Sequence, residues 1–511
     1  MLRRVAEWQA LLERTGSTLH DELRALYGDD PGLLDERAAH LRRLLEATAK
    51  TLGPGRPVVI ARAPARINLM GRHIDHQGGV CNLIAVNREV LVAASARGTN
   101  NVVITNADPE RFPKRRFNIV ERSKLLLHDE WRACVDDAAL RRSVNERRGD
   151  WALCVEAIML RLQHAFPEHR LRGMDLVVSG DIPIAAGLSS SSALVVAAGE
   201  AIAALGGLEI APQAFVELCA EGEWYVGTRG GAADHAAMKF AQRGQVARTG
   251  FFPFKVLAYE SWPEAWGLMV CFSGAEARKS GEARDSYNRK VAAYHIGREL
   301  LAGHFGERIE RLRDFVMGEH APDRGALIEA VQALPERIGL VEAAARLGTE
   351  AWSKLEPLLE THTPPEESYG VRGVVTFGLA EIVRSVAFAE VLRRRDARAF
   401  GELMNVSHDG DRVTGPVQPV EDGAPLERRP GAYGCSTPDI DLMVDSVGEI
   451  DGVYGAQISG AGLGGCIMVL AAPEAQAEVE GRLTEEYYAP RAIAPLMFRC
   501  VPVGGSGLLA G

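Results

Sequence analysis

Apolar residues recur at helical spacing in two stretches near the start of the chain: Val5, Trp8, Leu11 and Leu12, then Leu41, Leu44 and Leu45. This spacing predicts two amphipathic helices, separated by the turn-forming residues 28–32. A helix with one apolar face has to cover that face. We therefore expect the helical extension formed by residues 1–53 to pack on the domain that follows it.

After residue 53 the pattern changes to short apolar runs that alternate with helical periods. The runs predict strands at about 57–61, 84–95, 101–106 and 174–180. Helices are expected in the Ala- and Val-rich segment that ends near 206, at 212–226, and over most of 276–400, most clearly at 332–347 and 382–395. A chain that mixes both kinds of element in this way indicates α/β or α+β layers.

The length of 511 residues predicts more than one domain. We place the boundary so that residues 54–255 form an N-terminal domain and residues 256–511 form a C-terminal domain. Within the C-terminal domain, residues 409–434 are polar and rich in Gly and Pro, which predicts a surface insertion.

Composition and charge narrow the class of protein. The chain is 47% hydrophobic and 25% charged, as is typical of globular proteins, and it has no apolar run of about eighteen residues that would predict a transmembrane helix. Its net charge of −10, without a basic tail, argues against a nucleic-acid partner. The eight cysteines include no C-x-x-C pair, which is typical of free thiols in a reducing compartment. We therefore expect a cytoplasmic enzyme with neither a nucleic-acid nor a membrane partner.

A short polar loop follows the first predicted strand after the N-terminal extension. Within ten residues it contains Arg66, Arg72, His73 and Asp75, and it closes on a Gly-Gly pair at 78–79. Polar side chains concentrated on a loop beside a buried strand are typical of small-molecule sites.

Two further segments are rich in small residues. Pro183-Ile-Ala-Ala-Gly-Leu-Ser-Ser-Ser-Ser-Ala193 joins a predicted strand to a helix, and its serines would bring N–H groups, hydroxyls and the helix dipole to one point that suits a polyphosphate. The alternative interpretation is a helix that simply carries more capping serines than it needs. The P-loop motif G-x-x-x-x-G-K-[ST] is absent, so this turn would have to hold ATP in another way. Ser459-Gly-Ala-Gly-Leu-Gly-Gly465 allows close backbone approach, although a tight turn between strands would need the same glycines.

Taken together, these segments resemble the GHMP kinases, and in particular their galactokinase-like branch. The order A-P-x-R-I-N-L-x-G-x-H-x-D-x-x-G-G, P-x-x-x-G-L-S-S-S-S-A and S-G-A-G-x-G-G is that of the family. Tyr225-Val-Gly227 followed by Asp234 resembles the segment with the catalytic aspartate, and Ser286-Tyr287-Asn288 resembles one whose tyrosine lies near the sugar. The resemblance implies a two-domain α+β GHMP kinase fold with the active site between the domains. It also implies ATP, Mg²⁺ and phosphoryl transfer to the anomeric hydroxyl of a monosaccharide.

The resemblance also assigns roles to residues. Asp234 would accept or orient the proton of the attacking hydroxyl with Arg66 beside it, whereas a turn-capping aspartate and a structural ion pair are the alternatives. ATP would lie on the phosphate turn, made of Ala186, Gly187, Leu188, Ser189, Ser190, Ser191 and Ser192. Mg²⁺ would be held by Ser191 and Glu223, with Ser190, Ser192 and Glu221 as rivals. The sugar would contact Arg72, His73, Asp75, Tyr287, Gly460 and Gly462.

Arg72 departs from the family pattern, because galactokinases carry a glutamate there that accepts a hydrogen bond from the 6-hydroxyl of the sugar. An arginine side chain only donates, and its geometry matches a carboxylate in two parallel hydrogen bonds. We therefore expect a uronic acid, galacturonate or glucuronate, as the substrate. Two alternatives stay open. Arg72 could turn away to a protein carboxylate and leave a neutral sugar, as in a galactokinase, or the chain could be a non-catalytic sugar- and ATP-binding sensor protein.

Overall fold

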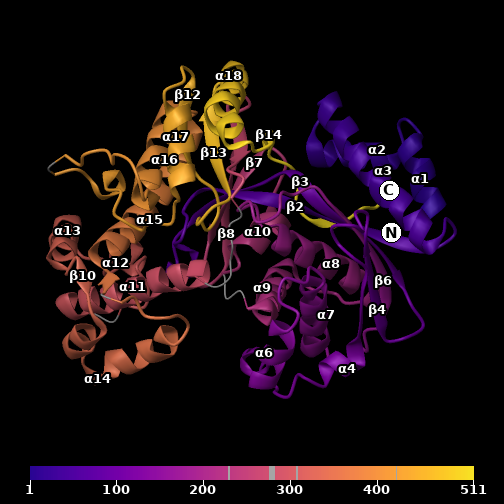
Figure 1. Cartoon of the computed structure of the whole chain (residues 1–511), viewed down its shortest axis with the longest axis horizontal. Coiled ribbons are helices and arrows are strands. Elements are labelled where there is room, and N and C mark those ends of the chain that lie inside the picture. Colours follow the sequence, from indigo (N-terminus) through magenta and orange to yellow (C-terminus); the bar gives the residue numbers. More distant parts are fainter. Residues whose placement is uncertain (228–230, 276–281, 307–308, 367, 422) are drawn as a thin grey trace.

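Two β-sheets, one in each half of the chain, organise the molecule (Figure 1). The computed structural model describes residues 1–227, 231–275, 282–306, 309–366, 368–421 and 423–511. The first sheet has the strand order β1-β2-β3-β6-β4-β5, with β7, β8 and β15 attached. Its strands are β1 (Arg3–Arg4), β2 (Pro57–Met70), β3 (Cys81–Ala96), β4 (Asn101–Asn106), β5 (Arg115–Asn118), β6 (Met174–Gly180), β7 (Gln245–Gly250), β8 (Lys255–Ser261) and β15 (Gly507–Leu508).

Helices cover both faces of this sheet, because successive side chains of a strand point to opposite faces. On β2, Val58 and Ile60 lie in one core with the N-terminal helices, whereas Val59 and Ala61 lie in another with the central helices. The first layer consists of α1 (Val5–Glu13), α2 (Thr18–Tyr27) and α3 (Pro31–Leu52), and the second is built mainly from α7 (Leu153–Ala165), α8 (Ser190–Gly206) and α9 (Pro212–Glu223). A sheet buried on both faces gives apolar runs rather than an alternating pattern.

The N-terminal extension contains three helices, where the sequence predicted two. Ser17 starts the additional one, since its hydroxyl accepts a hydrogen bond from the His20 amide, and Asp30 caps α3 in the same way. The helices pack on the sheet through side chains that include Trp8 and Leu44, both fully buried.

The second sheet and a group of helices form the other half of the molecule. The sheet has the order β12-β13-β9-β14 and consists of β9 (Gly267–Phe272), β12 (Val453–Ile458), β13 (Cys466–Ala471) and β14 (Met497–Cys500). The helices are α11 (Glu282–Phe305), α12 (Asp314–Met317), α13 (Arg324–Ala333), α14 (Leu340–Leu359), α15 (Arg372–Arg394), α16 (Ala397–Asp411), α17 (Pro438–Gly448) and α18 (Gln476–Leu483), and a small pair of strands, β10 (Arg337–Ile338) and β11 (Tyr369–Gly370), lies among them. Four shorter helices belong to the first half: α4 (Ile119–Ser123), α5 (Trp131–Asp136), α6 (Ala138–Asn145) and α10 (Ala233–Phe240).

The helix predicted at 332–347 is wrong as a single element. The chain leaves α13 at Ala333, forms β10 and starts α14 only at Leu340. Pro335 lies in the break, and a proline inside a helix removes an amide donor and clashes with the preceding turn. The helical spacing of apolar residues alone does not reveal this interruption.

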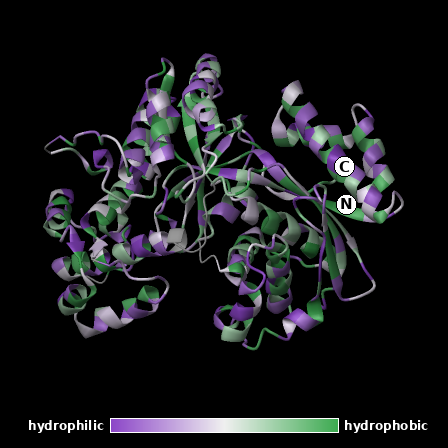
Figure 2. Ribbon diagram, viewed as in Figure 1, coloured by the Kyte–Doolittle hydropathy of each residue, from purple (hydrophilic) through white to green (hydrophobic). Residues whose placement is uncertain are grey.

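The two halves share one hydrophobic core where β2 meets the second sheet. Ile67 of β2 lies in the same cluster as Met468 of β13 and Phe388 of α15. Figure 2 shows hydrophobic strands at this centre and helices of mixed hydropathy around it. A boundary at residue 255 stays a prediction, and β8, which begins there, still pairs with β7 in the first sheet. Among the described residues, every helix is too short or too polar for a transmembrane span.

Candidate active site

An ion pair between Asp234 and Arg66 lies where the two halves meet. Asp234 stands in the first turn of α10, and Arg66 projects from β2. The guanidinium donates from Nε to Oδ1 at 2.6 Å and from Nη2 to Oδ2 at 2.9 Å, and the residue is 5% exposed. Two parallel charge-assisted hydrogen bonds fix the plane of the carboxylate as well as its place. The structure therefore brings these two predicted residues together.

The phosphate turn, residues 186–192, contacts the same pair. Arg66 Nη1 donates to the carbonyl of Gly187 at 2.6 Å, and the Ser189 hydroxyl donates to Asp234. Ser189 has a φ of +59°, which is uncommon for a residue with a side chain and turns the chain sharply into α8. The turn thus reaches the Asp234 carboxylate through both its backbone and a hydroxyl.

The glycine-rich turn, residues 459–465, packs against the phosphate turn. A Cβ atom on Gly187 would lie 2.5 Å from the carbonyl oxygen of Ser459, and one on Gly460 would lie 2.5 Å from the carbonyl oxygen of Gly187. Gly460 therefore lies against Gly187, and Gly462 lies against Cys435. The glycines let two backbones meet at the junction of the halves.

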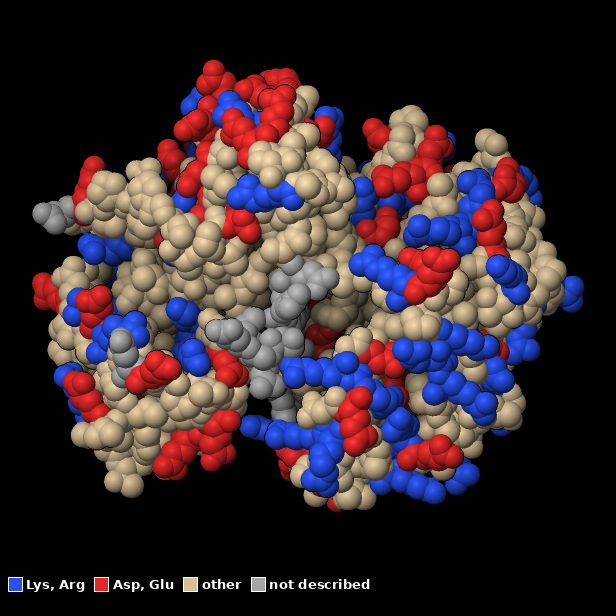
Figure 3. All heavy atoms as spheres, viewed as in Figure 1, with Lys and Arg blue, Asp and Glu red and all other residues tan. Residues whose placement is uncertain are grey.

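A cavity of about 610 Å³ opens beside Ser190 and Ser191 at the N-terminus of α8. Its apolar wall includes Val90, Phe112, Trp151, Ile182 and Leu194, and its basic lining includes Arg43 and Arg111. Figure 3 shows Lys and Arg side chains gathered over the part of this face where β4 and α4 lie. An apolar pocket next to a helix N-terminus can hold the base of a nucleotide with its phosphates at the turn. No local pattern in the sequence indicates this pocket, because its walls come from segments distant in the chain.

Of the two candidate metal carboxylates, Glu223 is the one beside the phosphate turn. It accepts a hydrogen bond from the Ser192 hydroxyl at 3.0 Å and lies 3.5 Å from Nε2 of His235. Glu221 instead pairs with Arg161 at 2.6 Å. A carboxylate and serine hydroxyls are oxygen ligands of the kind that Mg²⁺ prefers, so this part of the site fits that ion. Glu223 contacts Ser192 rather than the predicted Ser191.

Asp75 and Tyr287 lie close enough to Asp234 for its charge to act on both. A side chain at position 231 would collide with the Asp75 carboxylate, so Gly231 is needed there. Burial opposes ionisation of Asp75, but the hydrogen bond and charge of His76 lower its pKa overall. Burial raises the pKa of Tyr287, and the neighbouring Asp75, Cys435 and Asp234 act in the same direction. Tyr287 of α11 therefore brings the C-terminal half close to Asp75 and Asp234.

Arg72 does not stand free at the site. It is 2% exposed, its Nη2 donates to Asp411 at 2.8 Å and to Ser407 at 3.0 Å, and its Nη1 donates to Gln457. The amide of Arg72 donates to the carboxylate of Glu381 at 3.1 Å. The structure therefore does not support a sugar carboxylate as the partner of Arg72, because a carboxylate, a hydroxyl and an amide oxygen of the protein already accept from its two Nη atoms. Asp411 was missed, since it falls in the segment 409–434 that was expected at the surface.

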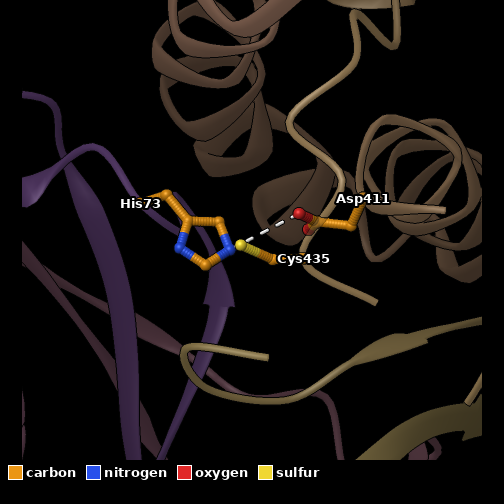
Figure 4. Close-up of side chains that lie close together, drawn as sticks. All are labelled: His73, Asp411 and Cys435. Carbon is orange, nitrogen blue, oxygen red and sulfur yellow. Dashed lines mark ion pairs between the residues drawn. The ribbon is translucent and has the colours of Figure 1, made fainter. Parts of the chain in front are cut away.

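His73 joins the buried cluster that Arg72 anchors. Its Nε2 lies 3.6 Å from Oδ1 of Asp411, and its ring stacks on Tyr433 with the centroids 4.3 Å apart. Figure 4 shows His73, Asp411 and Cys435 turned toward one another from the two halves of the molecule. His73 has a φ of +60°, a strained conformation for a residue of this size. Strain of this kind is found at functional sites.

Comparison with known proteins gives the family. The models that match are the GHMP kinases N-terminal domain over residues 153–242, the galactokinase galactose-binding signature over 50–96 and the GHMP kinases C-terminal domain over 388–489. The chain belongs to the galactokinase branch of the GHMP kinases. As a GHMP sugar kinase, it is a phosphotransferase whose acceptor is an alcohol group.

This chain is similar in sequence to individual galactokinases over most of its length. It is 24% identical to a galactokinase of Dictyostelium discoideum, over 84% of this chain and 83% of that protein, and 26% identical to one of Saccharomyces cerevisiae, over 85% and 86%. The fold matches that of Lactococcus lactis galactokinase complexed with galactose with a TM-score of 0.66 at 19% identity, over 91% of this chain and 99% of that one. The predicted family and the α+β two-domain GHMP kinase fold are confirmed.

Proposed function

We propose that the protein transfers the γ-phosphoryl group of ATP to the anomeric hydroxyl of a neutral sugar of the galactose type. The observation that carries this proposal is the bidentate Arg66–Asp234 pair held against the phosphate turn. It puts a carboxylate, a cation and a set of N–H groups around one point, as phosphoryl transfer requires.

The residues of this site have distinct tasks in that reaction. Asp234 orients the attacking hydroxyl and accepts its proton, because its two oxygens are held in a fixed plane. Arg66 lies between this carboxylate and the carbonyl of Gly187, so its charge also faces the transferring phosphoryl group. The two turns meet beside this point, one from each half of the molecule.

ATP and Mg²⁺ are the partners that the site fits. The nucleotide base would occupy the cavity beside Ser190 and Ser191, with its phosphates at the N-terminus of α8. Glu223 and Ser192 would hold the metal ion, which supplies positive charge to the phosphate oxygens.

A neutral substrate is favoured over a uronic acid for two reasons. Arg72 is paired with Asp411, so a sugar carboxylate would compete with a buried protein carboxylate for the same donors. The match to a galactose-binding signature and the names of the relatives, galactokinases, point the same way. Binding of a second anion beside Asp411 would leave one of the two negative charges unpaired.

The test is sugar-dependent release of ADP by wild type and by Asp234→Asn, each with galactose, ATP and Mg²⁺. We expect activity in wild type and a loss of about 10²- to 10⁴-fold in the variant, which is the usual contribution of a general base. Asp396→Asn is the matched control, because Asp396 is an exposed helix cap and asparagine caps as well. Wild-type turnover no higher than that of Asp234→Asn would mean a sensor rather than an enzyme.

A further inference from the structure

Several buried polar atoms near the sugar loop lack a hydrogen bond within the part of the chain that the structure describes. They include Nε2 of His73, Oδ1 of Asp411, and the hydroxyls of Tyr294 and Tyr433. Buried polar groups in native proteins are almost always hydrogen-bonded, so a group of such atoms at one place calls for an explanation.

The atoms belong to one cluster. The rings of His73 and Tyr433 stack at 4.3 Å, and those of Tyr433 and Tyr294 lie 5.4 Å apart. The ligand atoms of His73, Asp411 and Cys435 all lie within 4.8 Å of one another (Figure 4). The cluster adjoins the substrate site, because the His73 ring lies 6.4 Å from that of Tyr287.

A metal ion does not explain this cluster. Arg72 donates to Asp411 at 2.8 Å, so a second cation would meet a guanidinium on the same carboxylate.

The charge of Asp411 instead acts on His73. Asp411 accepts a hydrogen bond from the Arg72 guanidinium at 2.8 Å, which favours its ionised form, and an ionised carboxyl group can only accept hydrogen bonds. Asp411 is itself 0% exposed and cannot reach a substrate directly. A small rotation of the imidazole brings Nε2, now 3.6 Å away, into hydrogen-bonding range of Oδ1.

We propose that Arg72 and Asp411 are positioning residues that act on the sugar through His73. Arg72 holds Asp411, and Asp411 accepts the Nε2–H of a neutral His73, so Nδ1 carries a lone pair and accepts a hydrogen bond from a substrate hydroxyl. Among the described residues, Nε2 of His73 is buried and lacks a hydrogen bond, whereas Nδ1 of His73 is not one of the atoms in this state. This difference agrees with the proposed orientation of the ring. The inference rests on the proposed sugar kinase activity and names how its site selects a hydroxyl group.

The first experiment needs no substrate. In protein labelled with ¹⁵N-histidine, the ring signals of His73 are assigned by their loss in His73→Asn. We expect a protonated Nε2 and an unprotonated Nδ1 in wild type, and a different or averaged tautomer in Arg72→Met/Asp411→Leu. That double variant leaves no buried charge unpaired and should fold. A wild-type ring protonated on Nδ1, or stoichiometric zinc in the purified protein, would overturn the proposal.

The second experiment measures selection itself. Values of kcat/KM are compared for galactose and for 2-deoxy-, 4-deoxy- and 6-deoxygalactose. Wild type should lose about 5- to 100-fold for the deoxysugar that lacks the hydroxyl His73 accepts, since a buried acceptor is then left unpaired. In Arg72→Met/Asp411→Leu, the ratio of kcat/KM for galactose to kcat/KM for that deoxysugar should fall toward one. The corresponding ratios for the other deoxysugars should be unchanged.

The matched control is Asp409→Asn, on the same helix, because Asp409 pairs with Arg412 and not with His73. It should keep all the wild-type ratios. Deoxysugar ratios that are the same in the double variant as in wild type would overturn the proposal. Absence of galactose phosphorylation in wild type would instead remove the proposed function, while the tautomer of His73 would still report on its pairing with Asp411.

Discussion

Two carboxylates near the end of α9 show how the surroundings of a residue, rather than its type, determine its use. Glu221 is tied to Arg161 at 2.6 Å, and Glu223 accepts a hydrogen bond from Ser192 in the phosphate turn. The sequence could not separate the two, because the spacing of each to Gly227 is one residue off the galactokinase pattern. Only the direction of each side chain on the helix decides between them.

Glu223→Gln should therefore impair the use of Mg²⁺. We expect the concentration of Mg²⁺ that gives half-maximal activity to rise by about 10- to 100-fold, the usual effect of losing a group at a metal site. A titration of activity with Mg²⁺ at saturating ATP measures this. Glu221→Gln is the control and should keep the wild-type titration, and equal shifts in the two variants would contradict the assignment of Glu223.

Arg72 marks the limit of inference from a single residue. Its type correctly indicated a carboxylate partner, but the partner is Asp411 of the protein rather than a sugar carboxylate. The polar, glycine-rich composition of 409–434 pointed to the surface, whereas Asp411 and Tyr433 are fully buried. A buried ion pair between distant segments leaves no local signal, because each partner alone looks like a surface residue.

At the scale of elements, two glycine-bearing turns form the contact between the halves at the active site. Gly187 and Gly460 have φ values of +78° and +76°, and each lies against the other turn. A side chain at either position would meet backbone that has no freedom to move aside.

Gly460→Ala should separate the turns and lower kcat. The variant combines an unfavourable positive φ with a collision against Gly187, so we expect a thermal midpoint lower than that of wild type and activity reduced by at least about 10-fold, because a small misplacement at the reacting centre is costly. Gly207→Ala is the control: Gly207 has a φ of +65° with open space around it, so only the backbone penalty applies. If both variants keep full activity, close contact of the turns is not needed for the reaction.

Elements with a strong local signal were the ones that the sequence predicted well. The strands β4 and β6 and the helix after the serines follow the apolar pattern closely. The additional N-terminal helix and the break at Pro335 were missed, since a cap at Ser17 and a single proline act within one turn and an apolar period averages over several.

At the scale of the whole molecule, the two ends of the chain meet on the first sheet. β15 pairs with β2, and the amide of Leu509 donates to the carbonyl of Ile60 at 2.8 Å. Pairing over such a separation in sequence is set by the completed fold, so the sequence analysis assigned these last residues to the C-terminal domain. The same long-range folding brings the cavity walls and the Arg72–Asp411 pair together.

The order of three motifs, in contrast, was enough to predict the family, and the residues of these motifs meet in one candidate site between the halves. Each motif supplies one part of the candidate site: Arg66 of the first motif from β2, Ser189 from the phosphate turn and Gly460 from the glycine-rich turn. A site assembled from three segments in a fixed order is a stronger signal than any one of them.

Product analysis by NMR tests the central claim most directly. The protein is incubated with galactose, ATP and Mg²⁺, and the product is examined by ³¹P NMR and by coupling between phosphorus and the sugar protons. We expect one phosphomonoester coupled to the anomeric proton and one equivalent of ADP, with galacturonate consumed more slowly than galactose. Phosphorylation at another carbon, faster consumption of galacturonate, or no phosphorylated sugar would contradict the account.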